Sequence, residues 1–389
     1  MSKKLWLAGR AVTVGAHLVA EKALTAEPHT AADVPRNGVT LTPEWLSAVL
    51  CAEVPRARVV SWHSPGGSSG SSERAALRVE YNEAGRAAGL PTQLFTKSTN
   101  SFSQRLLLGA TDCARGETYF YLDYRPKIDM EAANGYWGGV HDASWRSMIL
   151  MEDIAATRGA RFTDATESLT QDQVRDALSN LAVMHGTWWN SADLAPLKTP
   201  IDHYHNVANF VDMEGRAKVG LTRAAQVVPK SLHSEADRLW AGTQASLQLL
   251  TDQTPTLLHG DSHVGQTYIT GDGRMGWTDW QTIERGNWAY DVAYFLGSAC
   301  DPGDRRAWEH ELLDHYLQRL TDAGGEAPSF DDAWDSYRRS MFYPYSAWAM
   351  TIGRAWYQPK MQPVATCLAV VHRLSNAIVD LDSFAALGI

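Results

Sequence analysis

The chain has 389 residues, a formal net charge of -9, 44% apolar residues and 20% charged residues, which is typical of a soluble globular protein. The acidic balance lacks the basic footprint of a nucleic-acid-binding protein, so we expect no nucleic acid partner. The four cysteines are far apart and form no CxxC pair, which argues against a zinc site and indicates a reducing, cytoplasmic compartment.

The N-terminal segment combines two lysines, Lys3 and Lys4, with a short apolar run. Arg10 interrupts this run, and the remainder from Ala11 to Ala20 is too short to span a membrane and makes a poor signal peptide. We therefore expect no membrane span. An amphipathic helix and loop are expected over residues 1–40, appended to the rest of the chain.

Three strands and a loop are predicted next. Residues 57–62, 75–81 and 91–97 combine β-branched and aromatic residues with the alternation of half-buried strands. The Gly/Ser run, residues 64–72, lies between the first two and is expected to be a flexible loop. A strand, a Gly-rich loop, a strand, a turn and a strand that carries Lys97 follow one another in the order of a kinase N-lobe.

Helices and one further strand follow from local signals. Thr42 and Pro43 begin a helix, as cap and first helical residue. Residues 110–126 are expected to be helical, and residues 149–153 form an apolar strand that ends in acids and fits a hinge between lobes. The range 170–190 predicts a long helix, because a capping threonine precedes apolar residues at helical spacing.

The stretch from His259 to Gln281 carries the strongest chemical signal. Gly260 permits an unusual backbone turn that presents the Asp261 carboxylate, and such a carboxylate orients an attacking hydroxyl and takes its proton in phosphoryl transfer. Gln266 supplies an amide, and Asp279 ends a short apolar strand. An amide and a carboxylate together hold magnesium on nucleotide phosphates, so the spacing predicts the catalytic half of a kinase.

The same stretch resembles the aminoglycoside phosphotransferase and choline kinase-like family, whose usual motif is His-Gly-Asp-x-His-x-x-Asn. The chain matches this motif until its last position, where Gln266 replaces Asn. The amide is one methylene further out, which alters metal ligation because Mg²⁺ demands tight octahedral geometry. The resemblance implies an ATP-dependent kinase, with GTP still open, in which Asp261 is the base and Asp279 and Gln266 bind Mg²⁺.

The resemblance also implies nucleotide-binding residues in the N-terminal half. Lys97 is expected to pair with the α- and β-phosphates, and Glu117, in a segment similar to the family's Glu-x-x-Phe-Tyr helix, is expected to hold Lys97. A buried ammonium group needs such a partner. Backbone N–H groups of the Gly/Ser run are expected to close over the triphosphate. The other expected cofactor-binding residues are Gly66, Gly67, Ser68, Ser69, Met151, Glu152 and Ile154.

Five further residues are singled out around the motif. His263 is a candidate catalytic residue that orients the loop or lies near the phosphates, with a structural role equally open. Asp291 is expected to cap the N-terminus of a helix and to brace the catalytic loop. His185 lies on an apolar helical stripe and is expected to be a packed core histidine. Trp348 and Trp356 are candidates for the lining of an acceptor pocket.

These observations predict an α+β, bilobal protein-kinase-like fold with a small antiparallel β-sheet N-lobe and a mostly helical C-lobe. The expected boundaries are 1–40 for the N-terminal extension, 41–153 for the nucleotide-binding N-lobe and 154–389 for the catalytic and acceptor-binding C-lobe. The predicted function is transfer of the γ-phosphate of ATP to a hydroxyl of a small molecule. The run 280–296 favours the ecdysteroid-kinase-like branch, and the aromatic content favours a partly apolar alcohol.

Two other functions stay open. Gln266 in place of Asn is compatible with a catalytically impaired nucleotide-binding protein, although retention of the other motif residues argues against it. His259, Asp261 and His263 alternate along the chain and are compatible with the zinc site of a metallohydrolase. That hypothesis leaves Lys97 and the Gly/Ser run unexplained.

Overall fold

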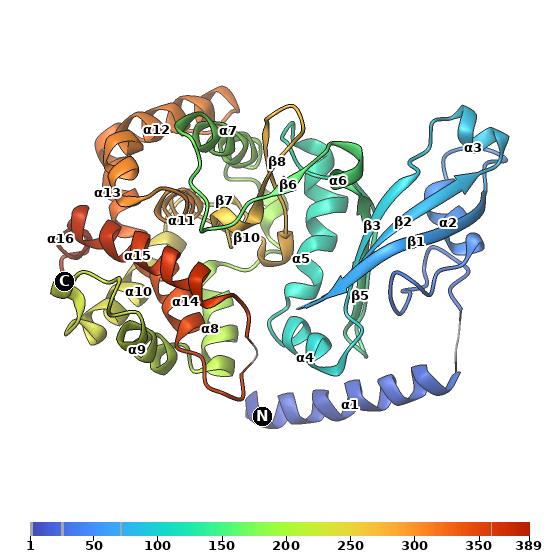
Figure 1. Ribbon diagram of the computed structural model, residues 1–389, viewed down its shortest axis with the longest axis horizontal. Helices are drawn as coiled ribbons and strands as arrows, with labels where there is room; N and C mark the ends of the chain where they lie inside the picture. The colour runs from blue at the N-terminus through green and yellow to red at the C-terminus, as the bar shows by residue number, and fades with distance from the viewer. Residues whose placement is uncertain (1–2, 25–26, 71, 359) are drawn as a thin grey trace. The chain divides into compact units, whose positions relative to one another are not determined.

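The computed structural model describes residues 3–24, 27–70, 72–358 and 360–389. The chain divides into two compact units, Met1–Lys127 with Ala132–Ala160, and Ile128–Glu131 with Arg161–Ile389. Four residues of the expected N-terminal extension (1, 2, 25 and 26) and Ser71 of the Gly/Ser run lie outside the described residues. Figure 1 shows the helices and strands of both units.

The first unit is built on a five-stranded sheet in the order β1-β2-β3-β5-β4, in which all neighbours are antiparallel. Its strands are β1 (Val59–Ser69), β2 (Glu73–Tyr81), β3 (Gln93–Ser98), β4 (Gly135–His141) and β5 (Arg146–Glu152). Alternate residues of β2 are buried, as the sequence alternation predicts. Leu77, Val79 and Leu94 pack with Trp45 and Leu46 into one hydrophobic core. The predicted strands are confirmed.

The Gly/Ser run was predicted to be a loop, but most of it belongs to a strand. Residues 59–69 form one strand, and Gly66, Gly67 and Ser69 stand opposite Ala76, Ala75 and Glu73 of β2. A Cβ atom on Gly67 would lie 2.3 Å from the Arg74 carbonyl oxygen, so glycine permits the close approach of the two strands. The expectation of a long flexible loop is therefore wrong, because the small residues extend a hairpin.

The helices of the first unit flank this sheet. They are α1 (Lys3–Leu24), α2 (Pro43–Leu50), α3 (Glu83–Ala87), α4 (Phe102–Ala110), α5 (Cys113–Tyr119) and α6 (Ile154–Thr157), with a π-helical turn (Phe120–Tyr124) and a 3₁₀ turn (Arg125–Lys127) after α5. The Thr42 hydroxyl accepts the Trp45 N–H at 3.1 Å, so the predicted helix start is confirmed. The π-helical turn is notable because such turns concentrate near functional residues.

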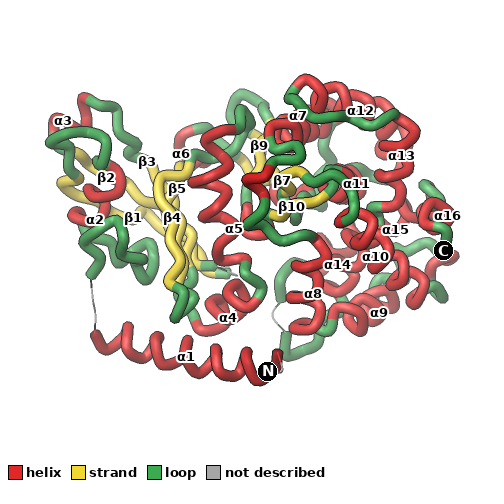
Figure 2. The backbone as a smooth tube through the Cα atoms, turned by 180° about the vertical axis from the view of Figure 1, so that it is seen from behind, coloured by secondary structure: helices red, strands yellow, loops and turns green. Residues whose placement is uncertain are grey.

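The N-terminal helix is held to the first unit by a buried ion pair. Helix α1 packs along α4 (Figures 1 and 2). Both terminal nitrogens of the buried Arg105 lie on the Glu21 carboxylate, at 3.1 and 2.7 Å, and Arg146 reaches it at 2.9 Å. Burial acts to raise the pKa of Glu21, but the bonds and charges of the two arginines outweigh it and lower that pKa. The negative charge of Glu21 therefore lies against the positive charges of both Arg105 and Arg146.

The second unit is mostly helical, with two small antiparallel sheets, β6-β8-β9 and β7-β10. Its strands are β6 (Arg161–Phe162), β7 (Thr256–Leu258), β8 (Thr267–Ile269), β9 (Met275–Trp277) and β10 (Glu284–Gly286). Its α-helices are α7 (Gln171–Thr187), α8 (Pro200–Val211), α9 (Met213–Arg223), α10 (Ala236–Thr251), α11 (Ala289–Ala299), α12 (Pro302–Asp322), α13 (Phe330–Arg339), α14 (Phe342–Ile352), α15 (Val364–Asp380) and α16 (Ser383–Leu387). The short 3₁₀ turns are Ala192–Leu194, Lys230–Leu232, Val264–Gln266 and Trp280–Thr282.

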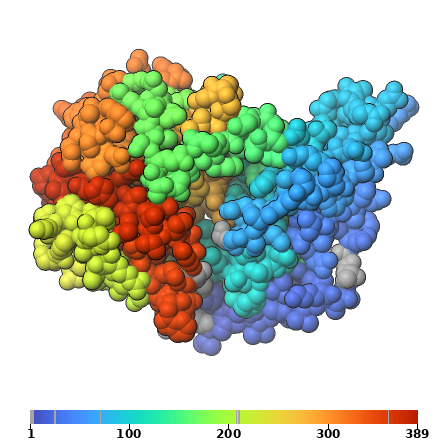
Figure 3. Space-filling view, viewed as in Figure 1, coloured from blue at the N-terminus to red at the C-terminus, as the bar shows by residue number. Residues whose placement is uncertain are grey.

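Helix α11 is the centre of the second unit, since every residue from Ala289 to Ala299 is buried. The space-filling view shows α12 and α13, in orange, beside α15 and α16, in red (Figure 3). The long helix predicted at 170–190 is present, and Thr170 and Gln173 form a capping box at its start. The predicted α+β fold, with a small antiparallel sheet and many helices, is confirmed.

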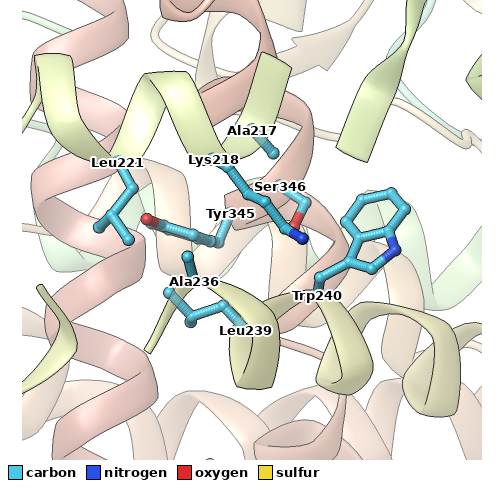
Figure 4. A pocket seen from close by; sticks show the side chains of 8 residues that line it. All are labelled: Ala217, Lys218, Leu221, Ala236, Leu239, Trp240, Tyr345 and Ser346. Atoms are coloured by element: carbon cyan, nitrogen blue, oxygen red, sulfur yellow. The ribbon is translucent and has the colours of Figure 1, made fainter. Parts of the chain in front are cut away.

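A cavity among α9, α10 and α14 is a packing gap (Figure 4). Its volume of about 10 Å³ holds roughly one water molecule. Its lining residues are Ala217, Lys218, Leu221, Ala236, Leu239, Trp240, Tyr345 and Ser346. In the part of the chain that the structure describes, every helix falls short of the length and apolar character that crossing a membrane requires.

Replacing Glu21 by alanine is expected to destabilise the first unit by about 3–5 kcal/mol, because it leaves the buried Arg105 charge without its partner. Glu53→Ala, at an exposed position of the same unit, is the control and is expected to change stability by less than about 0.5 kcal/mol. Urea unfolding of the three proteins measures the difference. Equal stabilities would contradict the assignment of Glu21 as the anchor of α1.

Candidate active site

The candidate catalytic loop connects β7 to β8 and contains the turn that the sequence predicts at Gly260. This residue has a φ of +79°, and a Cβ atom there would lie 1.9 Å from the Thr282 carbonyl oxygen. Both the left-handed backbone and the close approach require glycine. The turn therefore presents Asp261 in the way that the motif implies.

The buried carboxylate of Asp291 accepts hydrogen bonds from the backbone of this loop. Its Oδ2 accepts the His259 N–H at 2.6 Å and its Oδ1 accepts the Gly260 N–H at 3.1 Å. Nε2 of the buried His185 lies 3.2 Å from the same carboxylate, and Tyr316 contacts the other nitrogen of that ring at 2.7 Å. His185 is a core histidine, as predicted.

The expected role of Asp291 as an N-cap is wrong. Helix α11 begins at Ala289 with Trp288 as its N-cap residue, and Asp291 lies inside the first turn. Its carboxylate is occupied by the loop N–H groups of His259 and Gly260, so it braces the loop from within the helix.

Asp261 has a partner on each carboxylate oxygen. The Tyr294 hydroxyl donates to Oδ1 at 3.0 Å, Gln266 Nε2 donates to Oδ2 at 3.0 Å, and His263 Nε2 lies 3.6 Å from Oδ2. Burial acts to raise the pKa of Asp261, but the neighbouring His263 and Gln266 side chains outweigh it and lower that pKa. The side chain is 35% exposed. An ionised carboxylate with an open face is suited to accept a proton.

The two histidines of the motif differ in their environments. His259 donates from Nε2 to the Thr278 carbonyl at 2.9 Å and accepts the Asp261 N–H at Nδ1, at 3.3 Å. Burial lowers its pKa, so the ring is neutral, and both nitrogens are used by the backbone. His259 is therefore not available as a zinc ligand in this arrangement. The metallohydrolase hypothesis thus loses one of its three proposed zinc ligands.

His263 is buried beside Asp261. Its Nδ1 accepts the Gly265 N–H at 3.0 Å, which turns Nε2 toward the Asp261 carboxylate. Its ring meets Trp348 edge-on, with centroids 5.0 Å apart. The Gly265 N–H therefore fixes the orientation of the His263 ring beside Asp261.

Gln266 and Asp279, the predicted metal ligands, lie on segments that the backbone ties together. Thr278 N–H donates to the Gln266 carbonyl at 2.9 Å, next to the β8–β9 pairing. Asp279 directly follows and has left-handed backbone angles, φ 63° and ψ 63°, which are uncommon outside glycine and frequent at functional sites. Because the Gln266 amide nitrogen faces Asp261, its amide oxygen is the half suited to a metal ion.

Lys97 and Glu117 meet inside the first unit. Lys97 lies on β3 and Glu117 on α5, and their Nζ and Oε1 atoms are 2.9 Å apart with both side chains buried. The sequence resemblance implied this pair. In this pair the Lys97 ammonium group on the sheet is held in place by the Glu117 carboxylate from α5. A fixed positive charge of this kind is what phosphate recognition requires.

The hinge residues Met151, Glu152 and Ile154 are all buried. The Glu152 carboxylate is occupied by Arg158 at 2.5 Å and by the Thr157 hydroxyl at 2.6 Å. The Glu152 side chain is therefore committed to Arg158 and Thr157, and a contact with a nucleotide base would have to come from the backbone.

Sequence reasoning missed Tyr294 as a contact of Asp261. Tyr294 follows Asp291 by less than one helical turn, so both project from one side of α11; this spacing is the signal that could have identified it. Trp348 was proposed as a pocket residue but is buried and donates from Nε1 to the Tyr294 hydroxyl at 2.8 Å. Trp356, its proposed companion, is 90% exposed.

The antiparallel sheet of the first unit and the helices of the second are those of the predicted protein-kinase-like fold. A candidate aminoglycoside phosphotransferase from Ralstonia eutropha JMP134 has the same fold, with a TM-score of 0.50, 13% identity, and 87% of this chain and 97% of that chain covered. A choline kinase from Streptococcus pneumoniae is similar at a TM-score of 0.42 and 14% identity, over 84% of this chain and 94% of that chain. A macrolide 2′-phosphotransferase from Brachybacterium faecium is similar at 0.40 and 14%, over 85% and 98%.

Residues 126–339, more than half of the chain, match the model of the phosphotransferase enzyme family known as APH. The chain therefore belongs to this family, as its motif indicated, and is a small-molecule kinase with a hydroxyl acceptor. None of the curated proteins compared with the chain matches it.

A buried acid, Glu284, stands beside the catalytic loop. It lies on β10 opposite Leu258, and its Oε1 is 3.4 Å from Nδ1 of His203. Within the described residues its Oε2 has no hydrogen-bond partner. Burial, together with the negative charges of Asp291 and Asp261, raises the pKa of Glu284 well above its ordinary value of 4.5. The fold therefore favours the protonated form of this carboxyl.

Replacing Glu284 by glutamine is expected to stabilise the protein increasingly, relative to the wild type, as pH rises above about 4.5. The folded wild type keeps a proton that its unfolded state loses, so its stability falls through this window by about 1.4 kcal/mol per pH unit. Glutamine has no such proton. Urea unfolding at several pH values measures the difference, with the exposed Glu326→Gln as control; a difference that does not vary with pH would contradict the raised pKa.

Proposed function

We propose that the chain transfers the γ-phosphate of ATP to a hydroxyl of a small molecule, with Asp261 as the base and Asp279 and Gln266 as ligands of Mg²⁺. The observation that carries the proposal is the state of Asp261. Its carboxylate has a lowered pKa, is fixed by Gln266 and Tyr294, and keeps an open face. A fixed, ionised and accessible carboxylate is what orientation of an acceptor hydroxyl requires.

The residues fit a magnesium nucleotide. Carboxylate and amide oxygens, offered by Asp279 and Gln266, are the ligands that Mg²⁺ prefers, and the buried Lys97–Glu117 pair offers a fixed cation for phosphate oxygens. When bound, Mg²⁺ neutralises the charge that develops on the phosphate oxygens.

The work of the chain itself is orientation and proton transfer. The Asp261 carboxylate accepts the proton of the acceptor hydroxyl while the acceptor oxygen bonds to the γ-phosphorus. The bond from that phosphorus to the oxygen of ADP breaks, so ADP leaves with its electron pair. Lys97 stabilises the negative charge on the α- and β-phosphates, and Glu117 fixes the position of Lys97.

The remaining nucleotide contacts are assigned to the first unit. We place the backbone of residues 66–69 at the triphosphate and the backbone of Met151, Glu152 and Ile154 at the base. Residues 41–153 then form the nucleotide-binding lobe and residues 154–389 the catalytic and acceptor-binding lobe. The aromatic residues of the chain support a partly apolar alcohol as the acceptor.

Asp261→Asn is expected to lower acceptor-dependent turnover by about 10²- to 10⁴-fold, because the amide cannot take the proton. Nucleotide affinity is expected to stay nearly constant. The measurement is ATP consumption with Mg²⁺ against aminoglycosides, amino alcohols, sugars, nucleosides and sterol-like alcohols, together with ATP binding by calorimetry. Asp331→Asn, at an exposed position of α13, is the control. Unchanged turnover in the Asp261 variant would exclude this residue as the base.

Gln266→Asn is expected to keep or raise the rate, since the amide oxygen stays available to the metal on a shorter side chain. Gln266→Leu, which has no amide, is expected to raise the Mg²⁺ concentration for half-maximal rate by about tenfold. Magnesium titrations of the rate compare the two variants. A loss of rate in both variants without any change in the Mg²⁺ requirement would assign Gln266 to Asp261 alone.

A further inference from the structure

Tyr294 is a buried residue of α11 whose hydroxyl reaches the candidate base. Its side chain is almost fully enclosed, and its oxygen lies 3.0 Å from Asp261 Oδ1. The ring packs near His263, with centroids 5.9 Å apart. A buried phenol that points its only polar atom at a carboxylate needs that hydrogen bond, because burial without it is costly.

The direction of this hydrogen bond follows from the donors present. The Trp348 indole carries only a donor, so the Tyr294 oxygen accepts from it at 2.8 Å. The ionised Asp261 carboxylate carries only acceptors, so the Tyr294 proton points to Oδ1. Trp348, Tyr294 and Asp261 therefore form a chain of hydrogen bonds with a single orientation, and each bond strengthens the next.

The second carboxylate oxygen is held from another side. Gln266 Nε2 donates to Oδ2 at 3.0 Å, and Gln266 belongs to the loop, whereas Tyr294 belongs to α11. Donors from two separate elements, one on each oxygen, fix the plane of the carboxylate. His263 Nε2 is a third neighbour, 3.6 Å from Oδ2, and the acceptor positions that stay open are aimed in defined directions.

We propose that Tyr294 is a positioning residue for phosphoryl transfer, which sets the orientation of the Asp261 carboxylate toward the acceptor hydroxyl. The inference rests on the proposed function, in which Asp261 is the base. Misplacement of a reacting group by about 1 Å costs about 100-fold in rate, so a hydroxyl that fixes the base acts on kcat and leaves nucleotide binding unchanged.

The first arm of the test is structural and independent of turnover. Crystal structures of the wild type, Tyr294→Phe and Tyr337→Phe are compared. Tyr337 is the matched control, because it is a buried tyrosine of the same unit whose hydroxyl donates to another carboxylate, Glu309, at 3.0 Å. One orientation of the Asp261 carboxylate in the wild type and control, with several orientations in Tyr294→Phe, is expected. One orientation in all three overturns the proposal.

The second arm is kinetic and separates positioning from a general structural role. With MgATP and water, or the best acceptor of the panel, Tyr294→Phe is expected to lower kcat about 10- to 100-fold and to change KM for ATP by less than about twofold. Trp348→Phe keeps the phenol and is expected to give a smaller loss of the same kind. Tyr337→Phe is expected to leave kcat unchanged.

A double-mutant cycle with Asp261→Asn completes the kinetic arm. If Tyr294 acts through the carboxylate, Tyr294→Phe lowers the rate no further once Asp261 is asparagine. An equal fractional loss in both backgrounds overturns the proposal. Absence of MgATP-dependent turnover in the wild type would instead mean failure of the proposed function, and the crystallographic arm then decides whether Tyr294 fixes the carboxylate.

Discussion

The buried carboxylate of Asp291 is the interaction on which the candidate site depends. It is fully enclosed, and it accepts N–H groups from His259 and Gly260 at 2.6 and 3.1 Å. A buried charge is tolerated only when its oxygens are satisfied, so the loop and the helix that carries Asp291 have to keep one arrangement. The left-handed turn at Gly260, and with it the position of Asp261, follows from this requirement.

The pKa values of two acids near this carboxylate shift in opposite directions. Burial raises the pKa of Glu284, and the negative charge of Asp291 raises it further. Asp261 has His263 and Gln266 beside it, and these lower its pKa despite burial. The fold therefore favours the protonated form of one carboxyl in the core and the ionised form of another at the loop. This separation is how a fold assigns different roles to similar groups.

The sequence predicted the parts of this protein that depend on local pattern. Strand alternation predicted β2 and β3, the capping threonine predicted α2, and Gly260 signalled a special turn; the Lys97–Glu117 contact came from the family resemblance. The Gly/Ser run was wrong because small residues favour loops locally, while the pairing of Gly67 with Ala75 across the hairpin is a tertiary property. Composition alone does not distinguish the two.

Long-range contacts at the site were outside the reach of sequence pattern. Trp348 and Tyr294 are 54 residues apart and meet only because α11 and α14 belong to one core. Both side chains are large aromatics, which a sequence pattern assigns to the hydrophobic core. Only the structure shows that the Trp348 indole also donates a hydrogen bond to the Tyr294 hydroxyl. Helical spacing places Tyr294 on the same side of α11 as Asp291, so the sequence could have indicated which side of this helix faces the loop. It could not have indicated that the Tyr294 hydroxyl contacts Asp261.

Gln266 shows how a departure from a motif fits the geometry around it. The family's asparagine offers one short amide, whereas the glutamine amide of this chain spans from the loop to Asp261, with Nε2 3.0 Å from Oδ2. An amide has a donor end and an acceptor end. With the donor end on Asp261, the acceptor end is directed away from Asp261 and stays available to a metal ion. The longer side chain thus couples the orientation of the base to the proposed metal ligand within one residue.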